Sequence, residues 1–354
     1  MRSCLKYILC FVAYYSGVNF MYRKLRRDRS LLVLTYHRVV ADKDWGKCLS
    51  QKGMRVKTST FARQVKYLAR AYRIHSLDDS VSMLRSGDIP SGACSITFDD
   101  GWRDVYANGF PVMRRMKIPA TVFVATSLVG STDIFWPEKL TRTILRKGKL
   151  DEEELSRLSA VDPECGTLVQ STVLTNSEAE RFELIDSLIE RLKKLPEQRR
   201  VDFIAGTTSR PSRADSAQEP ARSIVDWHEI REMRRNRVLF GSHTDTHALL
   251  TNIEPEKMKV ELEQSKKRLS EELEEDINFF AYPNGDWNEA VKRAVIDAGY
   301  LAAFVAENRD NTISTDLFLL GRLNIHEGMS VSPWGRFSRS RFACELSGIF
   351  AARP

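Results

Sequence analysis

The chain has 354 residues, of which 42% are hydrophobic and 29% are charged. This composition excludes a disordered or fibrous chain, and the length suffices for one large domain or two ordinary ones. The formal net charge of +7 is concentrated at one end: in residues 1–29 seven basic residues face one acidic residue, which gives +6. Because nucleic-acid-binding proteins usually spread cations over a folded surface, this distribution argues against a nucleic-acid partner.

Residues 1–30 form an amphipathic, basic segment that stands apart from the rest of the chain. Its apolar run from Tyr7 to Tyr15 is shorter than the roughly 20 residues of a spanning helix. No cleavage site typical of a secretory signal follows. The pattern predicts an interfacial helix that contacts a membrane, with a buried N-terminal helix as the alternative. Since basic flanks tend to stay inside, we expect a cytoplasmic location at the inner membrane face; a periplasmic location is the alternative.

From residue 31 onward, short apolar runs end in polar residues and alternate with helical patterns, among them residues 105–116 and the long, charged, amphipathic stretch 255–273. Runs with so little polar alternation suit strands that are buried on both faces. Strand and helix in alternation predict an α/β fold with parallel strands, and about seven strands are enough for a distorted (β/α) barrel over residues 31–354. The runs are LLVLTYH (31–37), ACSITFDD (93–100), ATVFVAT (120–126), VLFGSH (238–243), INFFAYPN (277–284), LAAFVAEN (301–308) and FLLGRLNIH (318–326).

One stretch interrupts this alternation. Residues 138–226 are charged, rich in helix-forming residues and poor in β-branched runs, which predicts a helical subdomain inserted between two barrel strands. Within it, residues 177–195 are expected to form an amphipathic helix and residues 207–223 a loop. The insertion either shapes a substrate groove or serves packing alone.

Two motifs at strand ends carry the chemistry. TFDDG places Asp99 and Asp100 side by side after one strand, and GSHTDTH places His243 and His247 four residues apart after another. Two histidines and one aspartate supply three ligands for a divalent ion and leave coordination positions open. The second aspartate then remains free to accept a proton from water. Taken alone, Asp-Asp-Gly is also good turn chemistry, but a turn does not explain the second motif.

TFDDG followed by HTDTH resembles the NodB-homology polysaccharide deacetylases, carbohydrate esterase family 4. LTYHRV (34–39), FWP (135–137), FAYPNG (280–285) and RLNIHEGMS (322–330) are similar to its Gram-negative exopolysaccharide branch. The resemblance covers about residues 31–345, apart from the insertion. It implies the distorted barrel of that family.

The resemblance also implies roles for individual residues. Asp99 matches the catalytic base, and Asp100, His243 and His247 match the metal ligands. The metal implied is zinc, with cobalt or nickel as alternatives. The turn with Tyr282 and Asn284 matches the oxyanion and substrate motif, with the N–H of Asn284 as the oxyanion donor. His326 matches the catalytic acid.

Two departures from the family pattern concern the residues around the base and the acid. Ala281 stands where many relatives have the arginine that orients the base, and Arg322 is our candidate replacement. The motif that tunes the acid has no clear counterpart; Asp316 is the candidate. His37 and Trp136 are further candidates for contacts at the site. His37 is a candidate for contact with the substrate or with a residue that binds the metal, and Trp136 for stacking on a sugar. For both, a purely structural role is the alternative.

We therefore expect an enzyme, a metal-dependent hydrolase of linear amides that removes N-acetyl groups from GlcNAc-type amino sugars in a polysaccharide or glycoconjugate. A deacylase or deformylase of a lipid-linked sugar and a non-catalytic carbohydrate-binding relative are the alternatives. The expected partners are the N-acetylated polysaccharide or glycolipid and, through residues 1–29, a membrane surface.

Overall fold

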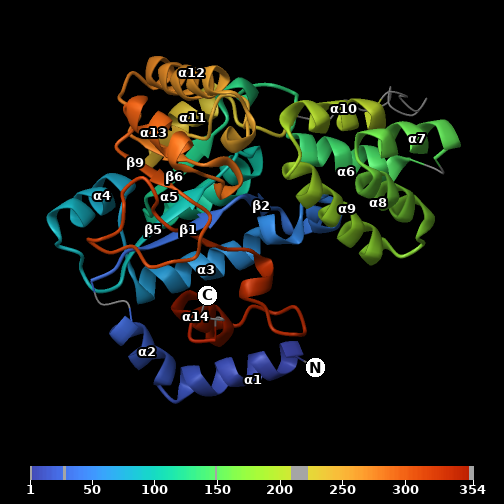
Figure 1. Cartoon of the computed structure of the whole chain (residues 1–354). Coiled ribbons are helices and arrows are strands. Elements are labelled where there is room, and N and C mark those ends of the chain that lie inside the picture. Colours follow the sequence, from blue (N-terminus) through green and yellow to red (C-terminus); the bar gives the residue numbers. More distant parts are fainter. Residues whose placement is uncertain (1, 27–28, 148–149, 209–221, 351–354) are drawn as a thin grey trace.

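A computed structural model of the chain describes residues 2–26, 29–147, 150–208 and 222–350 (Figure 1). Its centre is a parallel sheet whose strands come from the predicted apolar runs. Leu320, just before the last strand, forms a parallel bridge with Phe304 and so links the two ends of the strand order. The distorted (β/α) barrel is thereby confirmed. The order is β10 (Leu323–Asn324), β1 (Leu32–Tyr36), β5 (Ala93–Phe98), β6 (Ala120–Val124), β7 (Val238–Ser242), β8 (Phe279–Ala281) and β9 (Ala302–Phe304).

Three short strands were not expected from the sequence. β4 (Arg73–Ile74) pairs with β5, while β2 (Arg38–Val40) and β3 (Arg55–Lys57) form a separate parallel pair. All three are two or three residues long, so they show no periodicity that a sequence pattern could reveal.

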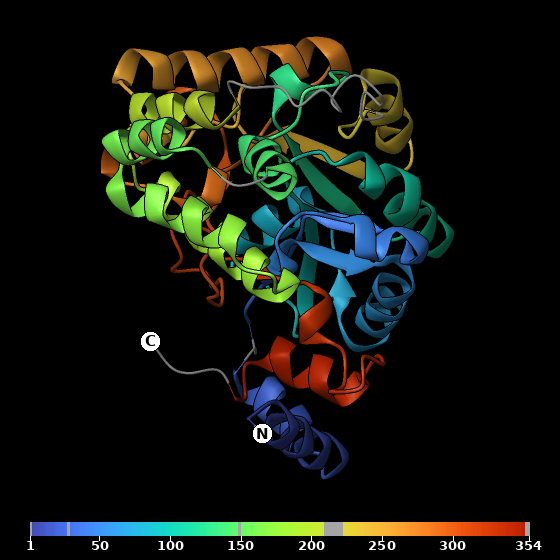
Figure 2. The same cartoon turned by 90° about the vertical axis from the view of Figure 1, so that its right-hand side faces the viewer.

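Helices cover the outside of the barrel (Figures 1 and 2). The long charged helix α12 begins and ends at the predicted residues, and it buries Met258, Leu262 and Leu269 against the strands. The predicted helix over residues 105–116 instead begins with a π-helical turn, Val105–Gly109, because Pro111 has no N–H for a continuous helical ladder. The covering helices are α3 (Thr58–Ala71), α4 (Leu77–Ser86), α5 (Phe110–Met116), α11 (Trp227–Arg234), α12 (Pro255–Leu273) and α13 (Glu289–Asp297).

Five of the six α-helices described between β6 and β7 form a lobe beside the barrel (Figure 1). The lobe has a core of its own, to which Leu140, Leu188 and Phe203 contribute fully buried side chains. Its fourth helix matches the amphipathic pattern that the sequence shows there, whereas residues 209–221 of the predicted loop lie outside the described residues. The helices are α6 (Trp136–Arg146), α7 (Glu152–Val161), α8 (Pro163–Leu174), α9 (Glu178–Lys193) and α10 (Glu197–Thr208).

The N-terminal helices α1 (Arg2–Tyr15) and α2 (Val18–Arg26) lie beside the C-terminal helix α14 (Arg339–Ser347) at one end of the molecule (Figures 1 and 2). One side of α1 buries Cys10 and Ala13 against Cys344. Lys6 Nζ pairs with Glu345 at 2.7 Å. No single described helix meets the length and hydropathy criteria for crossing a membrane; residues 4–15 and 18–25 meet them only together, with a bend of 80° between them.

The sheet register brings the two motifs to the same end of the barrel. Tyr36 is paired with Phe98, so His37 and Asp99 follow neighbouring strands at the same level. Val124 is paired with Ser242, and the N–H of His243 donates to the Val124 carbonyl oxygen. The carboxyl ends of parallel strands thus gather the polar residues of distant segments at one rim.

Gly241 in β7 lies where a side chain would not fit, because a Cβ there would be 2.6 Å from the Phe123 ring and 2.8 Å from the Phe279 carbonyl oxygen. We predict that Gly241→Ala lowers the free energy of unfolding by about 1–3 kcal/mol, measured by urea denaturation. Gly46→Ala is the matched control, since nothing lies within 4 Å of its Cβ position. Equal losses in the two variants would contradict the steric argument.

Candidate active site

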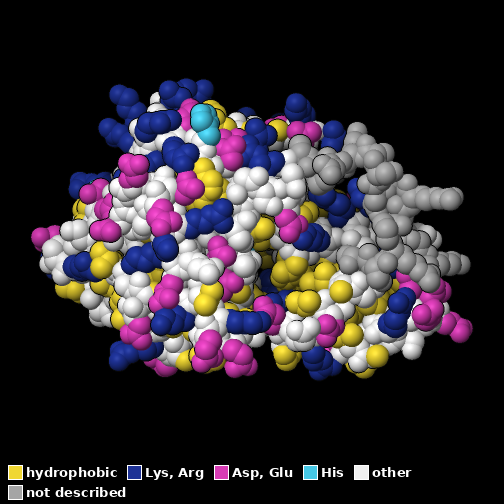
Figure 3. All heavy atoms as spheres, turned by 90° about the horizontal axis from the view of Figure 1, so that it is seen from above, with side chains coloured by type: hydrophobic (Ala, Val, Ile, Leu, Met, Phe, Trp, Pro, Cys, Tyr) yellow, Lys and Arg dark blue, Asp and Glu magenta, His cyan; other side chains and the backbone are white. Residues whose placement is uncertain are grey.

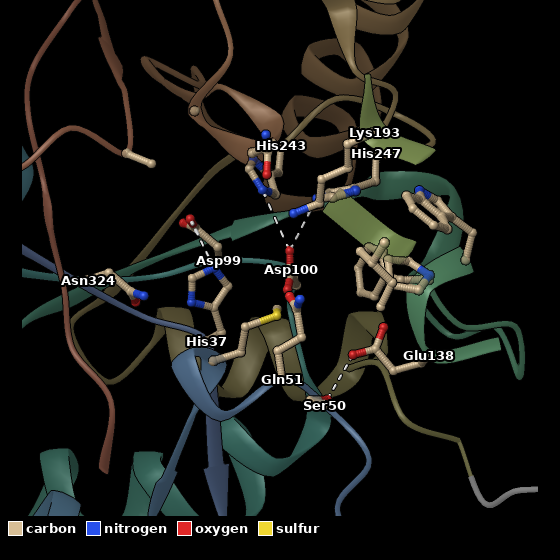
Figure 4. A pocket seen from close by; sticks show the side chains of 18 of the residues that line it. His37, Ser50, Gln51, Asp99, Asp100, Glu138, Lys193, His243, His247 and Asn324 are labelled. Atoms are coloured by element: carbon tan, nitrogen blue, oxygen red, sulfur yellow. Dashed lines mark hydrogen bonds and ion pairs between the residues drawn. The ribbon is translucent and has the colours of Figure 1, made fainter. Parts of the chain in front are cut away.

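A pocket of about 270 Å³ opens at the carboxyl ends of the barrel strands. Asp99, Asp100, His243 and His247 line its barrel side, and residues of the helical insertion, including Glu138 and Lys193, line the opposite side (Figure 4). The two predicted motifs, separated by more than a hundred residues in sequence, therefore share one cavity.

Asp100, His243 and His247 each offer one ligand atom, and these atoms lie within 4.8 Å of one another. His243 Nε2 is 3.6 Å and His247 Nε2 is 3.3 Å from Asp100 Oδ1 (Figure 4). Two imidazole nitrogens and one carboxylate oxygen that converge in this way suit a divalent ion such as zinc and leave further coordination positions open.

The HTDTH histidines do not lie on a helix, although their spacing suits one. They lie in a loop in which Thr244 and His247 adopt left-handed backbone conformations, with φ of 65° and 64°. Asp100 has a φ of 74° as well. Such conformations are uncommon outside glycine, and here they help to direct the side chains of Asp100 and His247 towards a common point. The carboxylate of Glu261 in α12 accepts hydrogen bonds from the N–H groups of Asp245 and Thr246 and so holds the loop.

Neighbouring groups orient the ligands. Trp102 Nε1 donates to Asp100 Oδ2 at 2.8 Å, so Oδ1 is the oxygen that faces the histidines. His243 Nδ1 donates to the Ala281 carbonyl oxygen at 2.7 Å, which leaves the Nε2 lone pair for an ion. Burial lowers the pKa of His243 to about 4, so the imidazole is neutral at neutral pH. Burial opposes ionisation of Asp100, but a hydrogen bond from His247 and the nearby imidazoles outweigh it and hold its pKa below the usual range.

Asp99 is gripped by Arg322, which lies just before β10. Arg322 Nη1 donates to Asp99 Oδ1 at 2.6 Å and Nη2 to Oδ2 at 2.9 Å, and the arginine side chain is fully buried. Burial raises the pKa of Asp99, but the guanidinium outweighs it and the pKa lies below its ordinary value. The structure thus places Arg322 where it can orient Asp99, a function for which Ala281 has no suitable side chain.

His37 faces the same carboxylate. Its Nε2 is 3.9 Å from Asp99 Oδ2, and its side chain lines the pocket (Figure 4). His37 Nδ1 is buried and has no hydrogen-bond partner among the described residues. His37 is therefore the imidazole that approaches Asp99 without contributing to the Asp-His-His cluster.

The YPNG turn borders the pocket, but its residues differ in what they can offer. The Tyr282 N–H donates to the Phe304 carbonyl oxygen and its hydroxyl to the Phe318 carbonyl oxygen at 3.0 Å, so both donors serve the fold. Asn284 lines the pocket with a φ of 59°. The turn's hydrogen bonds run from Gly285 to Tyr282 and from Asp286 to Pro283, and neither uses the Asn284 N–H. Of this pair, Asn284 retains a donor for substrate.

His326 is not brought to this pocket, which corrects the placement expected from the resemblance. The chain turns directly after β10 into the short helix Glu327–Met329, and His326 Nδ1 accepts from the Gly328 N–H at that turn. The imidazole lines a neighbouring cavity with Arg341 and Glu345. Asp316 is also elsewhere: it pairs with Lys292 at 3.4 Å and is largely exposed.

Trp136 opens α6 at the pocket wall, and the Arg200 guanidinium lies 5.7 Å from its ring centroid. Sequence reasoning missed two residues of the site. Trp102 follows the aspartate pair by two residues, and this short spacing is a signal that could have suggested its contact with Asp100. Lys193 reaches the pocket from α9 (Figure 4), and no local pattern marks it, because only the packing of the insertion brings it there.

A profile of the polysaccharide deacetylase family matches residues 86–157 and 200–303, segments that contain both motifs. The chain belongs to the polysaccharide deacetylase family. The interruption of the match, at residues 158–199, falls within the helical insertion.

Relatives of this deacetylase agree with that assignment. The poly-β-1,6-N-acetyl-D-glucosamine N-deacetylase of Staphylococcus epidermidis is 32% identical over 139 residues, which cover 37% of this chain and 46% of that protein. Bacillus subtilis YxkH is 20% identical over 90% of this chain and 79% of its own. Two solved structures share the fold: Streptococcus pyogenes deacetylase PplD (TM-score 0.55, 16% identity, covering 85% of this chain and 94% of that one) and IcaB from Ammonifex degensii (TM-score 0.52, 18% identity, covering 91% and 98%).

We predict that Asp100→Asn and His247→Ala each abolish tight binding of a divalent ion, measured by calorimetric titration of the metal-free protein with zinc. Trp102→Phe removes the hydrogen bond that orients Asp100, and it should weaken binding by roughly 10- to 100-fold. Asp99→Asn is the control and should retain the ion. A similar loss in Asp99→Asn would show that the ligand set has been misassigned.

Proposed function

We propose that this deacetylase is a metal-dependent hydrolase that removes N-acetyl groups from GlcNAc-type sugars of a polysaccharide. The observation that carries the proposal is the convergence of Asp100, His243 and His247 beside Asp99 in a single pocket. Family membership and the poly-β-1,6-N-acetyl-D-glucosamine N-deacetylase relative support the reaction and the substrate class.

The ion that we propose is zinc, with cobalt or nickel as alternatives, because an N/N/O donor set is compatible with all three. When bound, such an ion polarises the attacked carbonyl and lowers the pKa of a water molecule. The neutral state of His243 and the orientation of Asp100 Oδ1 towards the two histidines support its binding here.

Asp99 would accept the proton of the attacking water. A base must be ionised and correctly aimed, and the bidentate contact with Arg322 supplies both conditions, since it favours the carboxylate and fixes its plane. The negative charge that develops on the acetamide oxygen needs a hydrogen-bond donor, and the N–H of Asn284 at the pocket edge is suited to that role.

His37 would donate the proton that the leaving amine requires. Its Nε2 lies at the pocket beside Asp99, whereas His326 points into a different cavity. A proton donor has to reach the scissile nitrogen directly or through one water, so position favours His37. On the opposite wall, Trp136 offers an aromatic face on which a sugar ring could stack.

Acetate release from N-acetylglucosamine oligomers tests the proposed reaction. In Asp99→Asn we expect a fall in kcat of about 100- to 10,000-fold, because the amide cannot take the proton. Zinc content measured on the same sample controls for loss of the ion. Activity near that of the wild type would refute the role of Asp99.

Comparing His37 with His326 tests the choice of proton donor. We predict that His37→Ala lowers kcat by at least about 100-fold, whereas His326→Ala leaves the activity within a few-fold of wild type. The two variants remove the same side chain, so they are matched in chemistry. A larger loss in His326→Ala would restore that residue as the acid.

The Arg322 contact predicts a change in pH dependence. Arg322 holds the pKa of Asp99 down, and activity requires the Asp99 carboxylate, so Arg322→Gln should move the acid limb of the kcat/KM profile to higher pH. Arg322→Lys retains a cation without the bidentate fork and should move it less. An acid limb that stays in place in Arg322→Gln would show that the arginine is purely structural.

A further inference from the structure

Exposed hydrophobic side chains are concentrated on the N-terminal helices. Ten of the seventeen large hydrophobic residues that are exposed in the described chain lie within residues 5–25. They include Ile8 (56% exposed) and Val12 (57%) on α1, and Met21 (63%) and Leu25 (81%) on α2; the two α1 residues lie on the side of that helix away from Cys10 and Ala13, which pack on α14. So many exposed apolar side chains on two neighbouring helices, here called the apolar face, are uncommon on a protein that meets only water.

A basic groove of about 700 Å³ lies next to this face, between α2 and α3. Five cations line it: Arg23 from α2, Arg63, Lys66 and Arg70 from α3, and Arg339 at the start of α14. The three α3 residues follow one another at spacings of three and four, so they share one side of the helix. All three are exposed.

These cations have no acidic counterpart in the groove. No Asp or Glu is among its described lining residues, and none of the five forms an ion pair with a described acidic residue. Arg23 instead lies over the rings of Phe20 and Tyr72, at 5.6 and 4.9 Å from their centroids. Cations without an acidic partner beside an apolar face suit a ligand that is anionic at one end and apolar a few ångströms away.

Two aromatic residues, Tyr7 and Trp334, accompany the apolar face. Tyr7 packs edge-on against Trp334 with 5.7 Å between ring centroids, and Trp334 is 75% exposed. Tyrosine and tryptophan are enriched where a protein meets the boundary between lipid chains and head groups.

We propose that α1, α2 and the basic groove form a binding surface for an anionic phospholipid bilayer, with the apolar face entering the acyl-chain boundary and the groove holding lipid phosphates. The 80° bend between the two helices suits a helix pair that lies in the interface rather than one that crosses it. A second protein chain would offer apolar contact, but an anionic bilayer also supplies the fixed negative charge that the five cations lack. The inference goes beyond the deacetylase proposal and does not depend on it.

Co-sedimentation of the full chain with lipid vesicles tests the proposal. We expect binding to phosphatidylcholine vesicles that contain phosphatidylglycerol, weaker binding to phosphatidylcholine alone, and a decrease at high salt. The triple variant Arg63→Gln, Lys66→Gln, Arg70→Gln should bind the anionic vesicles at least about tenfold more weakly. The double variant Ile8→Ser, Phe11→Ser should also bind weakly, and both replaced side chains are exposed, so folding should be retained.

The control removes three cations from the opposite end of the molecule: Lys259→Gln, Lys267→Gln, Arg293→Gln. These side chains are 72–75% exposed, on α12 and α13. On that face cationic and anionic side chains are intermixed (Figure 3), and we expect unchanged vesicle binding. Circular dichroism and acetate release from soluble oligomers would verify the fold of every variant.

Four results would overturn the proposal: no vesicle binding, equal binding to neutral and anionic vesicles, unchanged binding of the groove variant, or an equal loss in the control. Self-association would overturn it as well, if the wild type eluted as a dimer that Ile8→Ser, Phe11→Ser converted to a monomer without any vesicle binding.

Discussion

Two adjacent carboxylates are buried at the centre of this protein, and compensating their charges is the constraint on which the site depends. Asp99 and Asp100 are only 4% and 3% exposed. Each has a separate set of partners: the Arg322 guanidinium for Asp99, and the Trp102 indole with two imidazoles for Asp100. Removing one partner of a buried ion pair typically costs about 3–5 kcal/mol, so Arg322 matters to stability as well as to orientation. Because their partners differ, the two carboxylates have different roles. Arg322 holds Asp99 apart from the cluster that Asp100 completes with the two histidines.

The parallel barrel provides the frame for this arrangement. Three of the groups that approach the aspartates lie directly beside a strand end: His37 after β1, Arg322 before β10, and His243 after β7. The strands determine where along the barrel axis these residues lie, and short loops with left-handed residues determine where their side chains point. Such conformations are costly unless the surroundings enforce them, and here Glu261 and the neighbouring strand ends do so.

Two parts of this deacetylase lie outside the barrel, the helical insertion and the N-terminal helices. The helical insertion has its own core and closes one side of the pocket with Trp136, Glu138 and Lys193, so the pocket lies between barrel and insertion. The N-terminal helices are attached to α14 at a different end and present an apolar face beside a basic groove. The candidate active site and the proposed membrane-binding surface thus lie in separate parts of the chain, which allows each to be altered without the other.

The sequence alone determined the strand-and-helix alternation, the bounds of α12, and the aspartate and histidine motifs, because periodicity and spacing are local properties. Only the tertiary structure decided which residues meet. It selected Arg322 for Asp99, placed His37 in the pocket and His326 outside it, and brought Lys193 in from the insertion. A one-dimensional pattern shows that a polar residue ends a strand, but the direction of its side chain depends on strand register and on the turn that follows. These features arise from packing between segments that are far apart in the sequence, and no local spacing encodes them.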